Sequence, residues 1–294
     1  MSRKHKKSAL SFGSLFQILV AIAVVMWLRD LRSGDDPTIA NLLAQSQSAN
    51  AAMPVGLENS GPAPGEVVIN QTQFHYTSEQ LSGLIQRYDP NPRNPAPIGG
   101  VYFFHLNGIK NATAIAPGLD QRAHIVNAFL EGFSPFAVDN VWMPLYVIAK
   151  RKHYMLDSLN YGKEELWQTS RQAFFMPHGD CEDHAIVLAD WLIDMGFDAR
   201  VALGKHQSDG HAWVVLVHEG KEFILEATQK SRLSTGTPYP LAATLPDYHP
   251  TAQFNRTAFW INTGSSFTTR YTGAHWVEQS HYSPLSSADN SASP

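Results

Sequence analysis

The sequence predicts an α+β fold that is preceded by one N-terminal transmembrane helix. Three stretches of the 294-residue chain support this prediction. Residues 181–195 have apolar side chains at helical spacing, and residues 212–225 contain two β-rich runs separated by a turn. Residues 8–28 are predominantly apolar and uncharged, and their length suffices to cross a bilayer. The hydrophobic content of 44% is ordinary for a chain that builds a packed core.

The predicted helix begins next to the only cysteine of the chain. Its apolar stripe recurs at i, i+3, i+4, i+7 and i+10 and consists of Ala185, Leu188, Ala189, Leu192 and Met195. Gly196 stands where a helix would end, and Asp180 is a suitable N-cap. Cys181 therefore falls in the first turn, where free backbone N–H groups and the helix dipole favour a thiolate over a thiol.

Two strands are predicted after this helix, at residues 212–217 and 223–225. If Glu219 and Gly220 form the tip of the turn between them, the pairing places Glu226 opposite Trp213. Glu226 is then one diagonal step from His211 on the same face, with the two Cβ atoms roughly 7–8 Å apart. A slip of one residue would move Glu226 to the other face of the sheet.

The order Cys181, His211, Glu226 suits a nucleophile, its general base and the residue that orients the base. The Cys181 backbone N–H and the side-chain amide of Gln168 are the candidates for holding an oxyanion. A lone cysteine is more often an inert buried residue than a nucleophile. The residues alone therefore leave a catalytic site and an inactive one as alternatives.

Three sequence motifs carry a resemblance to a known family. They are Gly-Asp-Cys-Glu-Asp-His-Ala at 179–185, Gly-His-Ala-Trp-Val at 210–214 and Leu-Glu-Ala-Thr at 225–228. In this order they resemble the core of the transglutaminase-like superfamily over about residues 140–230. Trp-Gln-Thr at 167–169 is similar to the bacterial transglutaminase-like cysteine proteinases, a branch that includes calcium-dependent periplasmic proteases.

The resemblance implies a papain-like core in which the cysteine helix packs on a small antiparallel sheet. It also implies a Cys–His–carboxylate site, in which the third residue is usually Asp and here is Glu226. The longer side chain can still accept a hydrogen bond from the imidazole. The chemistry requires no cofactor.

Acidic residues surround the cysteine, and two interpretations of them stay open. As helix-capping groups, Asp180, Glu182 and Asp183 would stabilise the helix N-terminus by about 0.3–1 kcal/mol each. As ligands, carboxylate oxygens suit calcium. The resemblance implies calcium at Asp180 and Glu182. No transition-metal motif is present in the sequence.

The N-terminus predicts an anchor in the inner (cytoplasmic) membrane. Arg3, Lys4, Lys6 and Lys7 precede the apolar segment, and no small-residue cleavage site follows it closely. This favours an uncleaved signal anchor over a cleaved signal peptide. The positive-inside rule places the N-terminus in the cytoplasm and the rest of the chain on the periplasmic or extracellular side.

Composition divides the chain into four segments: the basic tail and anchor (1–32), a flexible polar linker (33–65), a transglutaminase-like domain (66–282) and a disordered tail (283–294). Within the domain, strands are predicted at 67–69, 101–106 and 259–262, and helices at 78–88, 121–130 and 138–155. Residues 271–276 are aromatic and suit either a cleft or a core.

These features predict a membrane-anchored, outward-facing cysteine hydrolase that cleaves amide or peptide bonds through a thioester. Transfer to an amine, as in a transglutaminase, stays open, because the residues do not distinguish the acceptor. The alternative from another class is a non-catalytic binding or scaffolding module of the cell envelope. The expected partner is a protein or peptide substrate, and the net charge of −4 gives no reason to expect nucleic acid.

Overall fold

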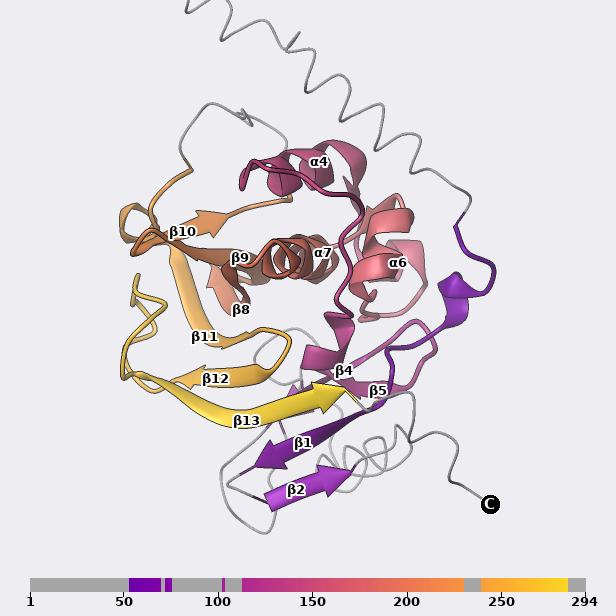
Figure 1. The fold of residues 1–294 in the computed structure, drawn as a ribbon, viewed down its shortest axis with the longest axis horizontal. Coiled ribbons are helices and arrows are strands. Elements are labelled where there is room, and N and C mark those ends of the chain that lie inside the picture. Colours follow the sequence, from indigo (N-terminus) through magenta and orange to yellow (C-terminus); the bar gives the residue numbers. More distant parts are fainter. Residues whose placement is uncertain (1–52, 70–71, 76–101, 104–112, 230–238, 285–294) are drawn as a thin grey trace, which may run out of the picture. The chain divides into compact units, whose positions relative to one another are not determined.

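An eight-stranded antiparallel sheet and the helix that carries Cys181 form the centre of the structure (Figure 1). The computed structural model describes residues 53–69, 72–75, 102–103, 113–229 and 239–284. All of them belong to one compact unit, residues 50–294. The α+β class and the antiparallel sheet are as predicted.

The sheet is built from strands of both ends of the chain, so that its order differs from the sequence order. From one edge to the other it contains β10 (Lys221–Leu225), β9 (Asp209–His218), β8 (Asp198–His206), β11 (Tyr248–Phe254), β12 (Ala258–Asn262), β13 (Trp276–Pro284), β1 (Gly65–Ile69) and β2 (Thr72–His75). The segment 259–262 was expected to be an edge strand, and this position is wrong: it forms β12, which pairs with β11 on one side and β13 on the other.

The β9–β10 hairpin has the predicted register. Lys221 pairs with His218 and Leu225 with Val214. Glu219 and Gly220 form the tip, with φ values of 50° and 70°. Positive φ at both central residues is the requirement of a tight hairpin turn that matches the strand twist, and glycine adopts it without strain.

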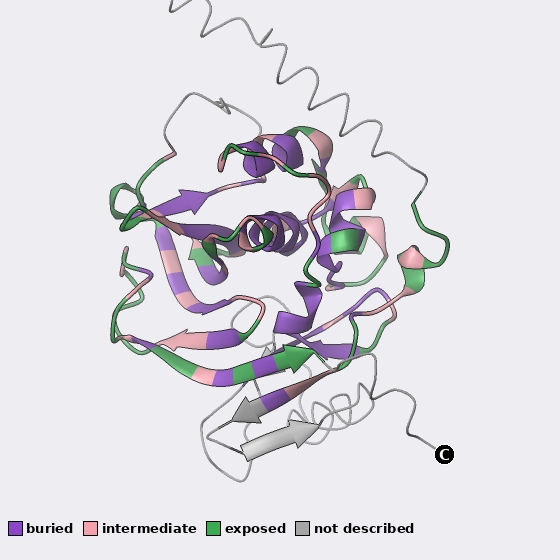
Figure 2. Cartoon of the chain, viewed as in Figure 1, coloured by how far each residue is buried: buried purple, intermediate pink, exposed green. Residues whose placement is uncertain are grey.

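Helix α7 (Cys181–Asp194) packs on β8 and β9 and is enclosed on its other side by α4 (Met143–Arg151) and α6 (Ser170–Phe175). Figure 1 shows α7 between these helices and the sheet. Residues Glu182 to Leu192 are all buried, and Figure 2 shows the helix almost entirely in the buried colour. Because the helix is enclosed, its N-terminal residue is held in a fixed place.

A second core packs around Trp213 of β9. Its buried members are Ala202, Trp213, Val215, Ile224, Ala242, Tyr248, Tyr271 and Trp276. Residues 271–276 therefore contribute to a core, which decides between the two interpretations left open by the sequence.

The fold is completed by β3 (Tyr102–Phe103), β4 (Ala114–Pro117), β5 (Ala123–Ile125), β6 (His153–Tyr154), α5 (Asp157–Asn160), β7 (His178–Gly179) and η3 (Ala242–Thr244).

The prediction of a helix at 121–130 is wrong. This segment forms β5 and a short 3-10 helix, η2 (Val126–Phe129). Its apolar spacing arises because nearly every side chain is buried, and pairing of β5 with β4 determines the backbone conformation. Asn127 also donates from Nδ2 to the backbone oxygens of Asn255 and Ala258, at 2.7 and 3.0 Å, which ties the segment to the β11–β12 corner.

Two predicted boundaries also differ from the structure. Residues 57–59, in the predicted linker, form η1 (Leu57–Asn59), and Gln172 Nε2 donates to the backbone oxygens of Leu57 and Ser60, each at 2.7 Å. The end of the predicted linker is therefore attached to α6. The helix predicted at 138–155 is shorter and corresponds to α4.

Some predictions concern residues outside the described part of the chain. These are the apolar segment 8–28, the helix at 78–88 and most of the tail at 283–294. Among the described residues, no helix is long and apolar enough to span a bilayer.

Candidate active site

Cys181 is the first residue of α7 and lines a cleft of about 190 Å³. The cleft is also lined by His211 of β9, by Tyr154 and Leu156, and by the carboxylates of Asp157, Asp180 and Glu182. Asp180 occupies the predicted N-cap position, but its side chain makes no capping hydrogen bond to the helix. The structure thus brings the nucleophile candidate and the base candidate to one cleft.

His211 and Glu226 are joined by a short side-chain hydrogen bond. His211 Nε2 and Glu226 Oε2 are 2.7 Å apart, and both side chains are largely buried. The contact follows from the hairpin register, because Leu225 pairs with Val214 and Glu226 is the residue directly after β10. With Nε2 engaged, Nδ1 is the ring nitrogen left for the cleft.

Glu226 is supplied with donors on both carboxylate oxygens. Oε1 accepts from the backbone N–H of Thr228 at 3.1 Å and from its hydroxyl at 2.5 Å, and Oε2 also accepts from the hydroxyl of Tyr248 at 3.2 Å. Burial acts to raise the pKa of Glu226, but the hydrogen bond and charge of His211 and the bonds from Thr228 lower it below its ordinary value. Glu226 is therefore an ionised acceptor at neutral pH.

The Cys181 thiol has different surroundings. Sγ donates to Glu182 Oε2 at 3.4 Å. Burial, and then the negative charge of Asp180, raise the pKa of the Cys181 thiol above its ordinary value, while a backbone hydrogen bond from Ala212 acts in the opposite direction. In this arrangement the cysteine is protonated at neutral pH.

Gln168 has structural contacts that do not match the predicted oxyanion role. Its Nε2 donates to the hydroxyl of Tyr161 at 2.8 Å and to the backbone oxygen of His178 at 2.9 Å. Its Oε1 accepts from Lys152 Nζ at 2.8 Å. Both amide protons are thus engaged, and the contacts give the oxyanion role of Gln168 no support.

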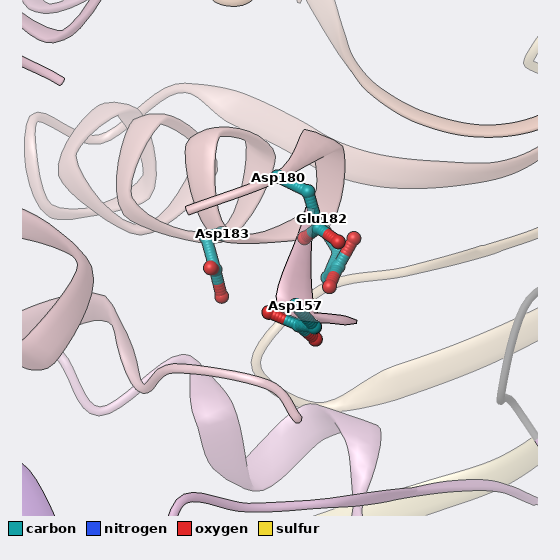
Figure 3. Close-up of side chains that lie close together, drawn as sticks. All are labelled: Asp157, Asp180, Glu182 and Asp183. Carbon is teal, nitrogen blue, oxygen red and sulfur yellow. The ribbon is translucent and has the colours of Figure 1, made fainter. Parts of the chain in front are cut away.

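Four carboxylates converge beside Cys181, and we call Asp157, Asp180, Glu182 and Asp183 the acidic cluster. One oxygen of each lies within 4.8 Å of those of the others. Figure 3 shows three of them on the first turn of α7 and its N-cap, with Asp157 facing them from α5. All four are buried, and each has one oxygen for which the described residues provide no hydrogen-bond donor: Asp157 Oδ1, Asp180 Oδ1, Glu182 Oε1 and Asp183 Oδ2.

Burial and neighbouring negative charges raise the pKa values of Asp157, Glu182 and Asp183. Burial, and then the charges of Asp180 and Asp183, raise the pKa of Asp157 to about 8. Burial likewise raises the pKa of Asp183 to about 8, against the attraction of Lys152, and it raises that of Glu182 well above its ordinary value. A buried group of acids with this property requires protons or a cation for stability.

A buried lysine compensates part of this charge. Lys152 is 1% exposed, and its Nζ donates to Gln168 Oε1 and to the backbone oxygens of Met176 and His178. A Cβ on Gly179 would overlap with both Asp183 and Lys152, so the residue before Asp180 must be glycine for the two to approach. One ammonium group does not balance four carboxylates.

Sequence reasoning did not find four of the residues that surround the site. Asp157 and Tyr248 are single residues far from the motifs, and neither position gave a local signal. Asp183 was interpreted as a capping group only, and Thr228 stood in a motif without a role. The spacing of Glu226 and Thr228, two residues apart at the end of a strand, was the one available signal for the hydroxyl contact.

A family model and a known protein are similar to parts of this chain. Residues 165–285 match the family model described as the CEP76 peptidase-like domain. A stretch of 55 residues, 18% of this chain, is 40% identical to the centrosomal protein of 76 kDa from Xenopus tropicalis and covers 8% of that protein. The chain therefore spans less than a tenth of the length of this relative. The region that the family model matches contains Cys181, His211 and Glu226. The resemblance to the bacterial proteinases stays a prediction.

Two solved structures of another protein are weakly similar. Legionella pneumophila LapG has 18% sequence identity and a TM-score of 0.35, and the alignment covers 48% of this chain and 77% of LapG. The calcium-bound form of LapG has 15% identity and a TM-score of 0.34, with 68% of this chain and 96% of LapG covered. TM-scores this low support no inference about the chain's function.

Proposed function

We propose that the chain is a cysteine hydrolase that acts on amide or peptide bonds through Cys181, His211 and Glu226. The observation that carries this proposal is the 2.7 Å hydrogen bond between His211 and Glu226 in the cleft that Cys181 also lines. A base held by a buried carboxylate beside a thiol at a helix N-terminus is the arrangement that nucleophilic catalysis requires.

In the proposed reaction, Cys181 and His211 act in sequence on the substrate. His211 Nδ1 accepts the thiol proton, and Sγ of Cys181 attacks the carbonyl carbon of the substrate. The C–N bond then breaks, His211 returns the proton to the leaving amine, and a thioester remains. Water attacks the thioester while His211 accepts its proton, and the Cys181 thiol is regenerated as the acid leaves.

The acidic cluster fits a calcium ion as part of this proposal. Calcium binds six to eight oxygen ligands, and the four cluster carboxylates each have an oxygen that no described donor contacts. Asp157, Asp180, Glu182 and Asp183 would hold the ion, a set that extends the predicted pair Asp180 and Glu182. When bound, the ion would neutralise negative charge next to Cys181.

A second candidate function is a binding module that keeps the fold without turnover. The observation that favours it is the Cys181 thiol, which donates to Glu182 and whose pKa is raised. An inert thiol of this kind would make the domain a non-catalytic scaffold.

We further propose that the domain is anchored in the membrane by residues 8–28 and acts outside the cytoplasm on a protein or peptide of the cell envelope. The four basic residues before the apolar segment support this orientation. Protease added to spheroplasts should digest residues 113–284 while the cytoplasm stays intact. A soluble mature chain that begins near residue 30 or 52 would contradict the anchor.

Alkylation of Cys181 tests the catalytic proposal without knowledge of the substrate, since the chain has one cysteine. We expect iodoacetamide to label the full-length chain at about pH 6 with calcium present. The variant His211→Ala should react about tenfold or more slowly, because an unpaired thiol with a pKa of about 8.5 is almost fully protonated there. His218→Ala, at the other end of β9, is the matched control and should react at the wild-type rate. Equal rates for wild type and His211→Ala would favour the scaffold.

A further inference from the structure

We propose that Tyr248 and Thr228 are positioning residues that hold the Glu226 carboxylate with Oε2 directed at His211. This inference rests on the proposed function, because it assigns a role in orienting the catalytic base. Neither residue is among those that the sequence predicts for the site.

The first support is the division of donors between the two carboxylate oxygens. Thr228 donates twice to Oε1, from its backbone N–H and its hydroxyl, at 3.1 and 2.5 Å. Tyr248 donates to Oε2 at 3.2 Å, the same oxygen that His211 contacts at 2.7 Å. Rotation of the carboxylate would break contacts on both sides, so the four donors define one orientation.

The second support is the packing that fixes the Tyr248 hydroxyl. Tyr248 is the first residue of β11 and is 4% exposed. Its ring stacks on His206 with a centroid distance of 4.2 Å and an angle of 17°, and it meets Trp213 edge to face at 5.1 Å. Tyr248 and Trp213 are both members of the second core. A hydroxyl on a ring held in this way has little freedom to leave Glu226.

The third support is the length of the glutamate side chain. Glu has one more rotatable bond than Asp, so a longer carboxylate must be restrained to keep one orientation. The Thr228 and Tyr248 contacts provide that restraint. Burial and the charge of Glu226 raise the pKa of Tyr248, so its hydroxyl keeps its proton and remains a donor.

The test uses the alkylation rate of Cys181 in the full-length chain with calcium present. Tyr248→Phe removes one donor and keeps the ring, so we expect a rate about tenfold lower, the scale of one hydrogen bond to a charged group. Tyr271→Phe is the matched control: its hydroxyl is equally buried in the second core and accepts from Trp213 Nε1 at 3.1 Å without contacting Glu226. It should react at the wild-type rate.

A double-mutant cycle separates positioning from general loosening of the fold. In the Glu226→Gln background, Tyr248→Phe should cause no further decrease, because the orientation of the carboxylate is already lost. Cys181 should be alkylated slowly in Thr228→Val and at the wild-type rate in Thr228→Ser. This pair provides the same test if Tyr248→Phe folds poorly. Equal rates for Tyr248→Phe, Tyr271→Phe and wild type, or additive losses in the cycle, would overturn the inference. If His211→Ala also reacted like wild type, the proposed function itself would fail.

Discussion

The candidate site contains Glu226 and the acidic cluster, and the two differ in how many hydrogen-bond donors their carboxylate oxygens receive. Glu226 receives four hydrogen bonds, from His211, Tyr248 and twice from Thr228. The acidic cluster has four carboxylates, each with an oxygen that no described donor contacts. The pKa values follow this difference: that of Glu226 is lowered, and those of Asp157 and Asp183 rise to about 8.

The difference indicates two kinds of role for the same functional group. A carboxylate with protein donors on both oxygens has its hydrogen bonds satisfied by the chain itself and can orient a histidine. A group of carboxylates without such donors requires something that the chain does not supply, and a divalent cation meets that requirement. We therefore expect Glu182→Gln to abolish calcium binding and Glu226→Gln to leave calcium binding unchanged.

The largest expected effect is on turnover. Cys181→Ala and His211→Ala should each remove activity by about 10⁴-fold or more, and the double variant should be little worse, because residues that act as a unit are non-additive. Glu226→Gln should retain a small, measurable activity, since this change only misorients the base. New protein N-termini in cells with the wild-type or Cys181→Ala chain would identify the substrate for this measurement. Wild-type activity in Glu226→Ala would remove Glu226 from the site.

Calcium should have the next largest effect, on stability. An ion at about 100 times its dissociation constant stabilises the native state by about 2.7 kcal/mol. At about 2–4 °C per kcal/mol, the melting temperature should rise by about 5–10 °C on adding calcium to chelator-treated protein. Asp157→Asn should abolish most of this rise. In chelator at about pH 9, where Asp157 is ionised, this variant should melt higher than wild type because it relieves repulsion. Glu164→Gln, an exposed acid on the same cleft, is the control and should behave as wild type.

The pH dependence in chelator sharpens the comparison further. Asp157 and Asp183 have folded-state pKa values of about 8, above their unfolded values near 4, so the folded state binds more protons between these limits. Their contribution to stability is complete below about pH 4 and is lost as the pH rises through about 8. The ion-free chain should therefore melt several degrees lower at about pH 8 than at about pH 5. Saturating calcium should remove this decrease, and a flat pH profile in chelator would contradict the raised pKa values.

The smallest expected effect is that of shortening Glu226. The Thr228 and Tyr248 donors lie at distances that suit a glutamate, so Glu226→Asp should fall short of His211 by about one methylene group. The alkylation rate of Cys181 should decrease by about tenfold, the scale of one charge-assisted hydrogen bond. A wild-type rate would mean that the backbone after β10 moves to accept the shorter side chain.

Local patterns in the sequence predicted the parts of the fold that depend on local interactions. Helix α7 begins at Cys181 as expected, and the β9–β10 register follows from the turn at Glu219 and Gly220. The helix predicted at 121–130 failed, because burial of nearly every side chain imitates helical spacing while strand pairing determines the backbone.

The site also contains contacts that depend on local structure and contacts that depend on tertiary packing. His211 and Glu226 are close in one hairpin, so their contact could be inferred from the register. Asp157 and Tyr248 reach the site through α5 and β11, and only tertiary packing brings them there. The acidic cluster could be predicted in part, as Asp180 and Glu182, because those residues flank Cys181.

Calcium titration by calorimetry tests the division between the two carboxylate sets most directly. The full-length chain, the Glu182→Gln variant and the Glu226→Gln variant would be compared after treatment with chelator. We predict one ion bound per wild-type chain, unchanged binding in Glu226→Gln and loss of binding in Glu182→Gln. Binding that persists in Glu182→Gln, or that is lost in Glu226→Gln, would contradict the assignment of the acidic cluster to the cation and of Glu226 to His211.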